Sequence, residues 1–229
     1  MSRARDADDP TVVLAVVAHE MKNALAPLGM TLQLVERQLL SGQAIAATDL
    51  AFSRAQVRVL SGLVNDLLDQ AQIDLAALPF RPQSTDVCAL VQDAVQAFRR
   101  AHDTPVAVDV PAAPLTATLD PVRVRQVLAN LLENAARYAP AGSEIAVRAR
   151  PLDGQLVRIE VADRGPGLRD EERTRIFDRF VRGAAGRGTS GLGLGLYLCR
   201  AIVEQHGGTI GVDSQPGAGC TFWINIRIT

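Results

Sequence analysis

The sequence predicts an α-helical hairpin followed by a two-layer α/β sandwich. Apolar residues with the spacing of a coiled-coil seam run through residues 11–40, and a second stripe runs through 50–71. After Pro82 short strands and helices mix without a regular strand–helix–strand repeat, which argues against a doubly wound sheet. Thirteen of the 18 glycines lie between Gly165 and Gly219, a concentration typical of backbone that approaches something closely or adopts unusual dihedral angles.

Composition narrows the class of protein. The chain has 229 residues, enough for one large or two modest domains, and its 48% hydrophobic content excludes intrinsic disorder. A net charge of −1 argues against a nucleic-acid-binding protein. The longest apolar run, residues 12–18, is far shorter than the roughly 20 residues that cross a bilayer, and the acidic residues before it argue against a signal peptide. Three widely separated cysteines exclude a zinc knuckle and a disulfide framework, so we expect a cytoplasmic protein.

The first 75 residues predict two helices. The first is expected to end at Ser41 and Gly42, and Thr48 or Asp49 is expected to cap the second. A hairpin with a narrow apolar stripe on each helix cannot bury both stripes, whereas two copies in a four-helix bundle can. We therefore predict a homodimer through residues 11–75, although the periodicity alone fits a helical spacer equally well. The stripes comprise Leu14, Ala18, Met21, Leu25, Leu28, Leu32, Val35 and Leu39, then Leu50, Ser53, Val57, Leu60, Val64, Leu67 and Ala71.

The remaining elements follow from alternation, caps and turns. Helices are expected at 86–100, from a cap at Asp120 to about 139, within 164–190 and near 192–206; strands are expected at 106–110, 115–119, 144–150, 156–162, 209–213 and 221–228. We expect an N-terminal tail at 1–10, a hairpin domain at 11–78 and a sandwich domain at 79–229.

Two glycine-rich stretches indicate a nucleotide site. In DRGPGL at 163–168, which follows a strand, Asp163 can accept a hydrogen bond from the exocyclic amine of a base, while Gly165 and Gly167 admit a ligand against the backbone. The same stretch is also typical of an ordinary turn. GLGLGL at 191–196 opens a helix whose free N–H groups suit phosphate, and it matches neither a P-loop nor the dinucleotide-binding pattern.

The stretch NLLENAARY at 130–138 adds polar groups on a predicted helix. Asn130 and Asn134 are four residues apart and so share one face. An amide oxygen suits Mg²⁺ together with phosphates. Arg137 can offer charge to a phosphate and Tyr138 a ring to a base. The alternative is a structural helix with two satisfied amides.

The stretch HEMKN at 19–23 lies on the first helix. His19 falls beside the seam, and a neutral imidazole is a good nucleophile toward phosphorus near neutral pH. Glu20 can accept or orient the ring proton, and Asn23, one turn later, can position a water. Pro27 predicts a bend one turn further along, because proline removes a helical hydrogen bond.

Together these stretches resemble the motifs of the sensor histidine kinases of two-component systems, in the family's order and from about residue 11 to the end. HEMKN is similar to the H box, residues 130–138 to the N box, 163–168 and 191–196 to two glycine boxes, IFDRF at 176–180 to the F box, and GAGCTF at 217–222 to a third glycine box. One departure is Ala24, which occupies the position of the family's common proline and leaves open how readily the helix bends.

The resemblance implies a dimerisation and histidine-phosphotransfer hairpin followed by a Bergerat-type ATP-binding domain. His19 would accept the γ-phosphoryl group of ATP with help from Glu20 and pass it to an aspartate of a response regulator receiver domain, and Asn23 would support dephosphorylation of that regulator. The cofactors would be ATP and Mg²⁺. The implied site places Mg²⁺ on Asn134, the phosphates by Asn130, Gly191, Gly193 and Gly195, and adenine on Asp163 in a pocket shaped by Gly165 and Gly167.

Two other functions remain open. A non-catalytic dimeric scaffold would bind nucleotide or a regulator, and intact His19, Glu20, Asn134 and Asp163 argue against it. A Bergerat-type ATPase without transfer needs a water-activating carboxylate where this chain has Asn130. Nothing before His19 resembles a sensor, so we expect the input domain on a partner or in a longer chain with a membrane tether.

Overall fold

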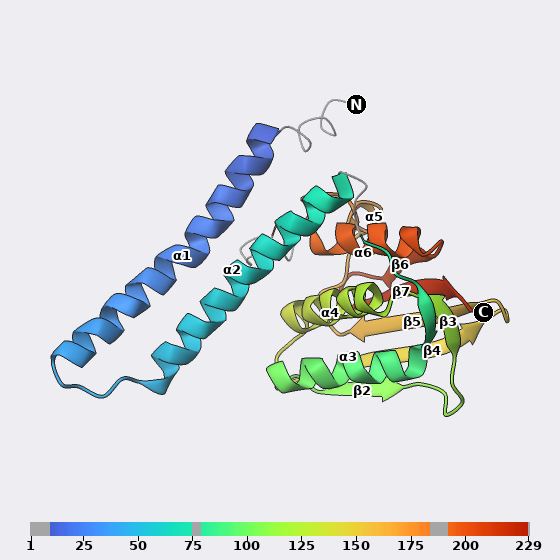
Figure 1. Cartoon of the computed structure of the whole chain (residues 1–229), viewed down its shortest axis with the longest axis horizontal. Coiled ribbons are helices and arrows are strands. Elements are labelled where there is room, and N and C mark those ends of the chain that lie inside the picture. The colour runs from blue at the N-terminus through green and yellow to red at the C-terminus, as the bar shows by residue number, and fades with distance from the viewer. Residues whose placement is uncertain (1–9, 75–78, 184–191, 229) are drawn as a thin grey trace. The chain divides into compact units, whose positions relative to one another are not determined.

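The computed structural model of the protein describes residues 10–74, 79–183 and 192–228 and divides into two compact units. The first unit contains α1 (Pro10–Leu40) and α2 (Ala47–Asp74), which run antiparallel as a hairpin (Figure 1). The second contains the strands and the remaining helices. The helical region followed by a mixed α/β unit confirms the predicted fold class.

The ends of the hairpin helices have local causes. The helix expected over 11–40 is confirmed, and it ends where Gly42 adopts a φ of +70° that favours glycine. The Ser41 hydroxyl donates to the carbonyl of Arg37 (2.9 Å), one of the unpaired carbonyls of the last turn. The cap predicted at Thr48 or Asp49 is wrong: α2 begins at Ala47, and both residues lie in its first turn. The negative charge of Asp49 there still suits the positive end of the helix dipole.

The predicted seam of α1 divides into two faces. Val35 is buried, with 9% of its surface exposed, and Met21 and Leu28 are half-buried; Ala24, which was not in the predicted stripe, is 4% exposed beside them. Leu25, Leu32 and Leu39, each seven residues from the next, are 49%, 51% and 61% exposed. On α2 the split repeats, with Ser53 buried and Leu50, Val57 and Val64 exposed. One half of each stripe therefore packs within the chain, and the other half remains uncovered in a single copy.

A five-stranded sheet forms the second unit, in the order β2-β4-β5-β7-β6. Strand β2 pairs parallel with β4 and the other neighbours pair antiparallel. The bounds are β2 (Val106–Asp109), β4 (Ile145–Leu152), β5 (Leu156–Asp163), β6 (Thr209–Ser214) and β7 (Cys220–Arg227). A separate pair, β1 (Gln83–Asp86) with β3 (Thr116–Leu119), is antiparallel. Strand β1 was not among the expected elements, because its residues carry no apolar alternation.

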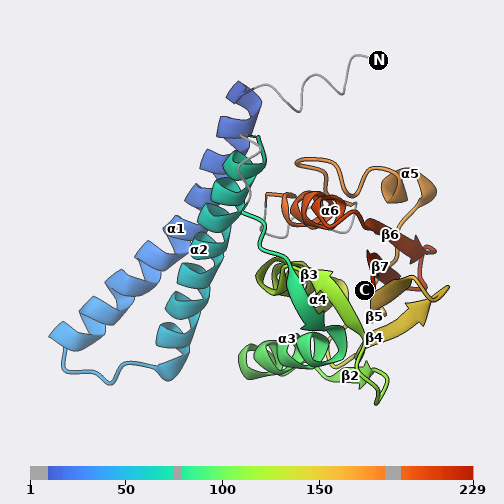
Figure 2. The ribbon, with the colours of Figure 1, turned by 45° about the vertical axis from the view of Figure 1, so that its right-hand side comes forward.

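Helices α3 (Val87–Ala101), α4 (Pro121–Tyr138) and α6 (Gly195–Gln205) cover one face of the sheet (Figure 2). A short helix, α5 (Asp170–Arg173), lies between β5 and α6 in the chain. Between sheet and helices lies the core, whose fully buried members include Val91, Val127, Leu131, Ile145, Val147, Ile159, Val161, Ile202, Val203 and Ile224. Burying such side chains is the main favourable term in folding this unit.

Aspartates cap two of these helices, at the first residue expected for α3 and at the cap expected for α4. The Asp86 side chain accepts from the backbone N–H of Cys88 (2.9 Å) at the start of α3. At the start of α4, Oδ1 of Asp120 accepts from Val122 and Arg123 (3.0 and 3.2 Å). Helix α6 begins at Gly195, three residues after the predicted start.

The opposite face of the sheet carries polar side chains around the one tryptophan of the chain. The Trp223 ring lies against Gly211, where a Cβ atom would come within 2.2 Å of it. The Arg158 guanidinium lies 4.5 Å from the centre of the same ring, a cation–π arrangement. Nearby, Arg150 forms an ion pair with the buried Glu160. In the described residues no helix is long and apolar enough to cross a membrane.

Asp120 provides a test of this packing. Burial raises the pKa of its carboxyl, but hydrogen bonds from the N–H groups of Arg81, Arg123 and Val122 outweigh that effect and leave the pKa below its usual value. Replacing Asp120 with Ala is expected to lower the free energy of unfolding by about 1–2 kcal/mol near neutral pH. Because the folded-state pKa is lowered, this contribution is present above the unfolded value of about 3.9 and is lost as the pH falls through the folded value.

Urea unfolding followed by circular dichroism at several pH values measures this difference. Asp120→Asn is the matched variant, since its amide oxygen can still cap α4 but its NH₂ group cannot accept from Arg81, and an intermediate loss is expected. A difference between wild type and Asp120→Ala that stays constant down to acid pH would contradict the linkage.

Candidate functional site

Asp163 lies at the end of β5 and is 9% exposed. Its Oδ1 accepts hydrogen bonds from the backbone N–H of Gly165 (2.7 Å) and of Cys220 (3.4 Å). Cys220 is its partner across the β5–β7 pairing, so the geometry of two strand ends fixes this oxygen. Within the described part of the chain, Oδ2 has no hydrogen-bond donor and remains available to accept one from a ligand.

The environment of Asp163 changes its proton affinity. Burial raises the pKa of the carboxyl, and the hydrogen bonds from Gly165 and Cys220 oppose this effect only in part. A poorly hydrated carboxylate with one fixed oxygen suits a neutral donor such as the exocyclic amine of a base, because little reorganisation is needed on binding.

Around Asp163 the backbone packs too closely for side chains. A Cβ atom on Gly165 would lie 2.7 Å from Oδ1 of Asp163 and 3.1 Å from the carbonyl oxygen of Tyr138. Gly167 and Gly219 both adopt positive φ, of +70° and +82°, and a Cβ on either would lie 2.0 Å from a backbone carbonyl oxygen. The predicted glycines therefore shape the loop, and Gly219 of the third glycine box acts with them.

Two polar residues in this region were absent from the predicted site. The Ser214 hydroxyl donates to the carbonyl of Gly219 (2.7 Å) and accepts from the N–H of Leu168 (2.9 Å), so it joins the two glycine-containing turns. Cys220 supplies a backbone donor to Asp163. Neither role has a local sequence signal, because both depend on the pairing of β5, β6 and β7.

The second group of predicted residues meets where α4 passes the start of α6. The Asn130 side chain is half-buried, and its Nδ2 donates to the carbonyl of Gly195 at 3.4 Å. A Cβ on Gly195 would lie 3.7 Å from the Asn130 side chain, which is ordinary van der Waals contact. The N–H groups in the first turn of α6 have no partner within the helix, as phosphate binding requires.

Asn134 lies one turn beyond Asn130 on α4 and is half-buried. Its side chain makes no hydrogen bond to another described residue, so its amide oxygen can accept a cation. The described residues contain no group of three or more His, Cys, Asp or Glu side chains that could hold a metal. A single amide oxygen fits Mg²⁺ only where phosphates and water supply the other ligands, which is the usual arrangement for this ion.

The remaining residues predicted to bind nucleotide lie near these groups, except Gly191, which is not among the described residues. Arg137 and Tyr138 end α4, with Arg137 exposed and Tyr138 half-buried beside Gly165 through its carbonyl. Gly193 has a φ of +71°.

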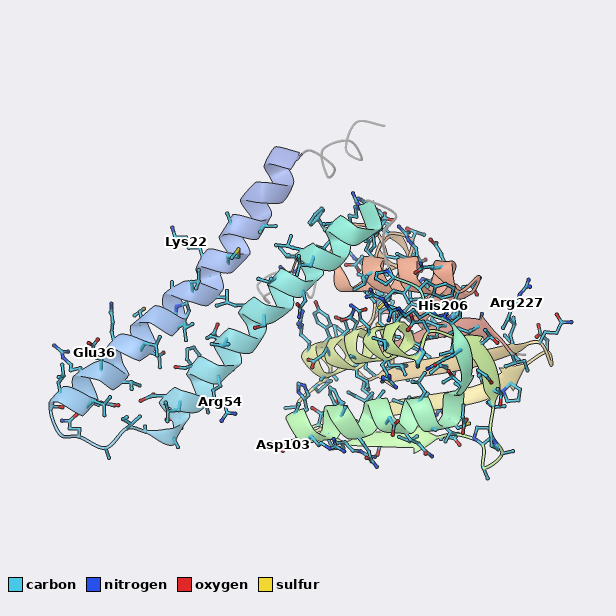
Figure 3. The ribbon with its side chains drawn as sticks, viewed as in Figure 1. Lys22, Glu36, Arg54, Asp103, His206 and Arg227 are labelled. Carbon is cyan, nitrogen blue, oxygen red and sulfur yellow. The ribbon has the colours of Figure 1, made fainter. Side chains whose placement is uncertain are left out.

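The H box lies in the first unit, on α1. His19 and Glu20 are helical, but their side chains lie outside the description. Asn23 is exposed and the next residue, Ala24, is 4% exposed, so Asn23 lies on the solvent face of the helix and Ala24 on the face inside the hairpin. Lys22 and Glu36 project outward from the same helix (Figure 3). Helix α1 continues through Pro27, whose carbonyl accepts from the Thr31 hydroxyl (3.0 Å).

Side chains of the F box contact both α6 and the sheet. The rings of Phe177 and Phe222 meet edge to face at 6.2 Å. Asp178 Oδ1 forms an ion pair with Arg200 (3.3 Å), and the Arg179 guanidinium lies 5.0 Å from the centre of the Tyr197 ring. The segment that leads toward residues 184–191 is thus attached to the helix that follows them.

Two family models match the chain. The model described as "His Kinase A (phospho-acceptor) domain" matches residues 11–76, and the model described as "Histidine kinase-, DNA gyrase B-, and HSP90-like ATPase" matches residues 119–229. The first match contains the H box, and the second contains Asn130, Asn134 and Asp163.

Curated and solved proteins agree with these matches. The "Adaptive-response sensory kinase SasA" of Thermosynechococcus vestitus is 34% identical over 228 residues, which include 94% of this chain but 59% of the relative. The chain therefore spans less than two thirds of the length of such relatives. The structure of the Acinetobacter baumannii histidine kinase AdeS superposes with a TM-score of 0.68 and 27% identity, covering 92% of this chain and 98% of that one. Full-length ShkA in complex with AMPPNP gives a TM-score of 0.67 and 28% identity, covering 96% of this chain and 46% of that one.

One chain therefore contains a phosphoacceptor match on its hairpin, followed by an ATPase match on the unit that contains Asp163. The motifs found in the sequence occur in the same order. The chain belongs to the sensor histidine kinases, and it carries their transmitter core.

Proposed function

We propose that the protein is an ATP-dependent histidine kinase that phosphorylates itself on His19 and transfers the phosphoryl group to an aspartate of a response regulator receiver domain. The observation that carries the proposal is the presence, in one chain, of a phosphoacceptor domain and an ATPase domain. The domain boundaries that go with it are a tail at 1–10, a phosphoacceptor hairpin at 11–78 and an ATP-binding domain at 79–229.

ATP is assigned to the second unit. The adenine amine donates to Oδ2 of Asp163, while Gly165 and Gly167 keep the backbone close to the base. The phosphates lie by Asn130 and the first turn of α6, with Gly191, Gly193 and Gly195 leaving the N–H groups unobstructed. The complex of ShkA with AMPPNP supports nucleotide binding by this fold.

The metal ion and the remaining side chains belong to the phosphate end of that site. Asn134 offers its amide oxygen to Mg²⁺, Arg137 its charge to a phosphate and Tyr138 its ring to the base. A bound Mg²⁺ would neutralise the charge that develops on the phosphate oxygens.

In the transfer step, a neutral ring nitrogen of His19 forms a bond to the γ-phosphorus, the bond from phosphorus to the β–γ bridging oxygen breaks, and ADP leaves with that electron pair. Glu20 receives the ring proton. In the second step a carboxylate oxygen of the regulator attacks phosphorus, the phosphorus–nitrogen bond breaks with its electron pair on the ring nitrogen, and Glu20 returns the proton so that neutral imidazole leaves. Exposed Asn23 is assigned to orienting the water that later hydrolyses the regulator's acyl phosphate.

Loss of His19 tests the phosphoacceptor. His19→Gln is expected to take up no acid-labile label from γ-labelled ATP and Mg²⁺, because no nucleophilic nitrogen remains. Asn134→Ala is expected to slow labelling by at least about a hundredfold, since one charge-stabilising contact is lost. Glu36→Gln, exposed on the same helix, is the control and should label as wild type.

Label that persists on His19→Gln would overturn the assignment of the phosphoacceptor. Labelled kinase incubated with purified receiver domains then tests the second step, and loss of label from the kinase without gain by any receiver aspartate would overturn the transfer.

The raised pKa of Asp163 predicts a pH dependence of nucleotide affinity. Only the ionised carboxylate is a strong acceptor for the adenine amine, so affinity should be constant well above the pKa and fall as the pH drops through it. Because burial raises that pKa, the loss should begin at a higher pH than the ordinary aspartate value of about 3.9. Calorimetric titration with ADP across pH measures it.

Asp163→Asn separates this effect from the titration of the nucleotide's own phosphates. The variant should bind more weakly at neutral pH and show only the phosphate part of the pH profile. A wild-type profile that parallels the Asn variant would contradict the role of Asp163.

A homodimer through the hairpin is part of the proposal. The exposed stripe of Leu25, Leu32 and Leu39 faces away from the packed half of the seam, and it would be covered by a second copy in a four-helix bundle. Burial of these three side chains and of Leu50, Val57 and Val64 on α2 provides the driving force for association.

Sedimentation at micromolar concentration tests the dimer. Leu32→Glu, on the exposed stripe, is expected to dissociate it, because a charge would be buried without a partner. Met30→Glu is the matched control, since Met30 is 72% exposed but lies off the stripe, and it should remain dimeric. Equal dissociation of both variants, or a monomeric wild type, would contradict this interface.

A further inference from the structure

The chain enters the second unit through residues 79–81, which are held against the start of α4 and the end of α6. The backbone N–H of Arg81 donates to Oδ2 of Asp120 at 2.8 Å. The Arg123 side chain donates from Nε to the carbonyl of Pro79 at 3.3 Å. The Phe80 ring meets the His206 ring edge-on at 4.8 Å. These six residues, Pro79, Phe80, Arg81, Asp120, Arg123 and His206, form what we call the linker anchor.

His206 is the centre of the linker anchor, directly after the last residue of α6 (Figure 3). Its Nε2 lies 2.9 Å from the backbone nitrogen of Asp120, and its Nδ1 lies 2.7 Å from the carbonyl oxygen of Ile202. A backbone nitrogen can only donate and a carbonyl can only accept, so Nδ1 carries the single ring proton and Nε2 is the acceptor. Both ring nitrogens are satisfied, and the orientation of the ring is fixed.

The same two helices meet again at the proposed phosphate site, which lies at the middle of α4 and at the start of α6. Helices α4 and α6 run antiparallel: Asp120 meets His206, the Cys199 thiol lies 3.9 Å from the carbonyl of Val127, and Asn130 meets Gly195. At 1.5 Å per residue, the anchor and the Asn130 contact are about 15 Å apart along the pair. Val127, Ile202 and Val203 are fully buried, so the pair is tightly packed between these two contacts.

We infer that His206 is a positioning residue that couples the linker to the nucleotide site through the α4–α6 pair. The inference rests on the proposed function, because it requires nucleotide at the Asn130–Gly195 end. Nucleotide that draws α4 and α6 together there also strengthens the contact between Asp120, His206 and residues 79–81. Coupling of two binding equilibria is reciprocal, so release of the linker weakens nucleotide binding by the same factor.

The test uses the full chain and two readouts. Hydrogen exchange of the Arg81 amide reports the anchor, because that N–H is bound to Asp120. Calorimetry reports the affinity for ADP. In wild type, saturating ADP is expected to slow Arg81 exchange by about fivefold, the low end of measured coupling between sites.

Three variants distinguish the role of the His206 Nε2 as a hydrogen-bond acceptor from the role of its ring contact with Phe80. His206→Phe keeps a ring against Phe80 but leaves the Asp120 N–H without an acceptor, so the response of Arg81 to ADP should vanish and ADP affinity should fall about fivefold. His206→Gln places an amide oxygen near the position of Nε2 and should restore most of both. Phe80→Ala, at a residue that is 37% exposed, should weaken both readouts with less risk to folding than a change at the half-buried His206.

His102→Phe is the matched control. His102 also ends a helix, stacks on Phe98 and pairs with Glu133, but it lies outside the linker anchor. The Arg81 response to ADP should persist in this variant.

Two results would overturn the inference. One is an Arg81 exchange rate that does not change with ADP in wild type. The other is wild-type affinity for ADP in both single variants, His206→Phe and Phe80→Ala, when both are folded. Failure of the proposed function looks different, because wild type would then bind no ADP while the Arg81 amide would still be protected relative to Phe80→Ala.

Discussion

The antiparallel packing of α4 on α6 is the constraint on which the second unit depends. Both helices lie on the same face of the sheet, and each brings a different kind of group to the same place. Helix α4 contributes side-chain amides, Asn130 among them, and α6 contributes backbone N–H groups that begin at Gly195. The proposed binding of a polyphosphate with a cation needs both sets, because one supplies an oxygen ligand and the other supplies donors. Sequence positions 65 residues apart therefore form one site only if the two helices keep their register.

The end of the proposed site to which we assign the base depends on a different constraint, the close approach of backbone to backbone. Asp163 ends β5 beside the start of β7, and Gly165 and Gly219 occupy positions where any side chain would collide with this carboxylate or its carbonyl. Hydrogen bonds from two backbone N–H groups hold one oxygen of the carboxylate. The site is thus built from strand pairing first and from side chains second, which makes the carboxylate rigid before a ligand arrives.

Much of the fold and of the candidate site could be predicted from short sequence patterns. The features that the sequence did not predict depend on contacts between distant residues. Asp120 stands directly before a proline and an apolar helical pattern, so its role as a cap is legible from the sequence. Asp163 stands between an alternating strand and glycines. In contrast, β1 (Gln83–Asp86) has no alternation to signal a strand, since only the second half of it is even partly buried. The contacts of Ser214 and the single protonated nitrogen of His206 depend on residues 46 and 86 positions away, which no local pattern can indicate.

The packing of Trp223 on Gly211 has a consequence for spectroscopy. The chain has one tryptophan, and it lies on the sheet in the second unit beneath the Arg158 guanidinium. Its indole emission therefore reports on the separation of β6 from β7 in the second unit, whereas the far-ultraviolet signal also includes the two helices of the hairpin. Comparing the two optical signals during unfolding would distinguish one cooperative transition from two.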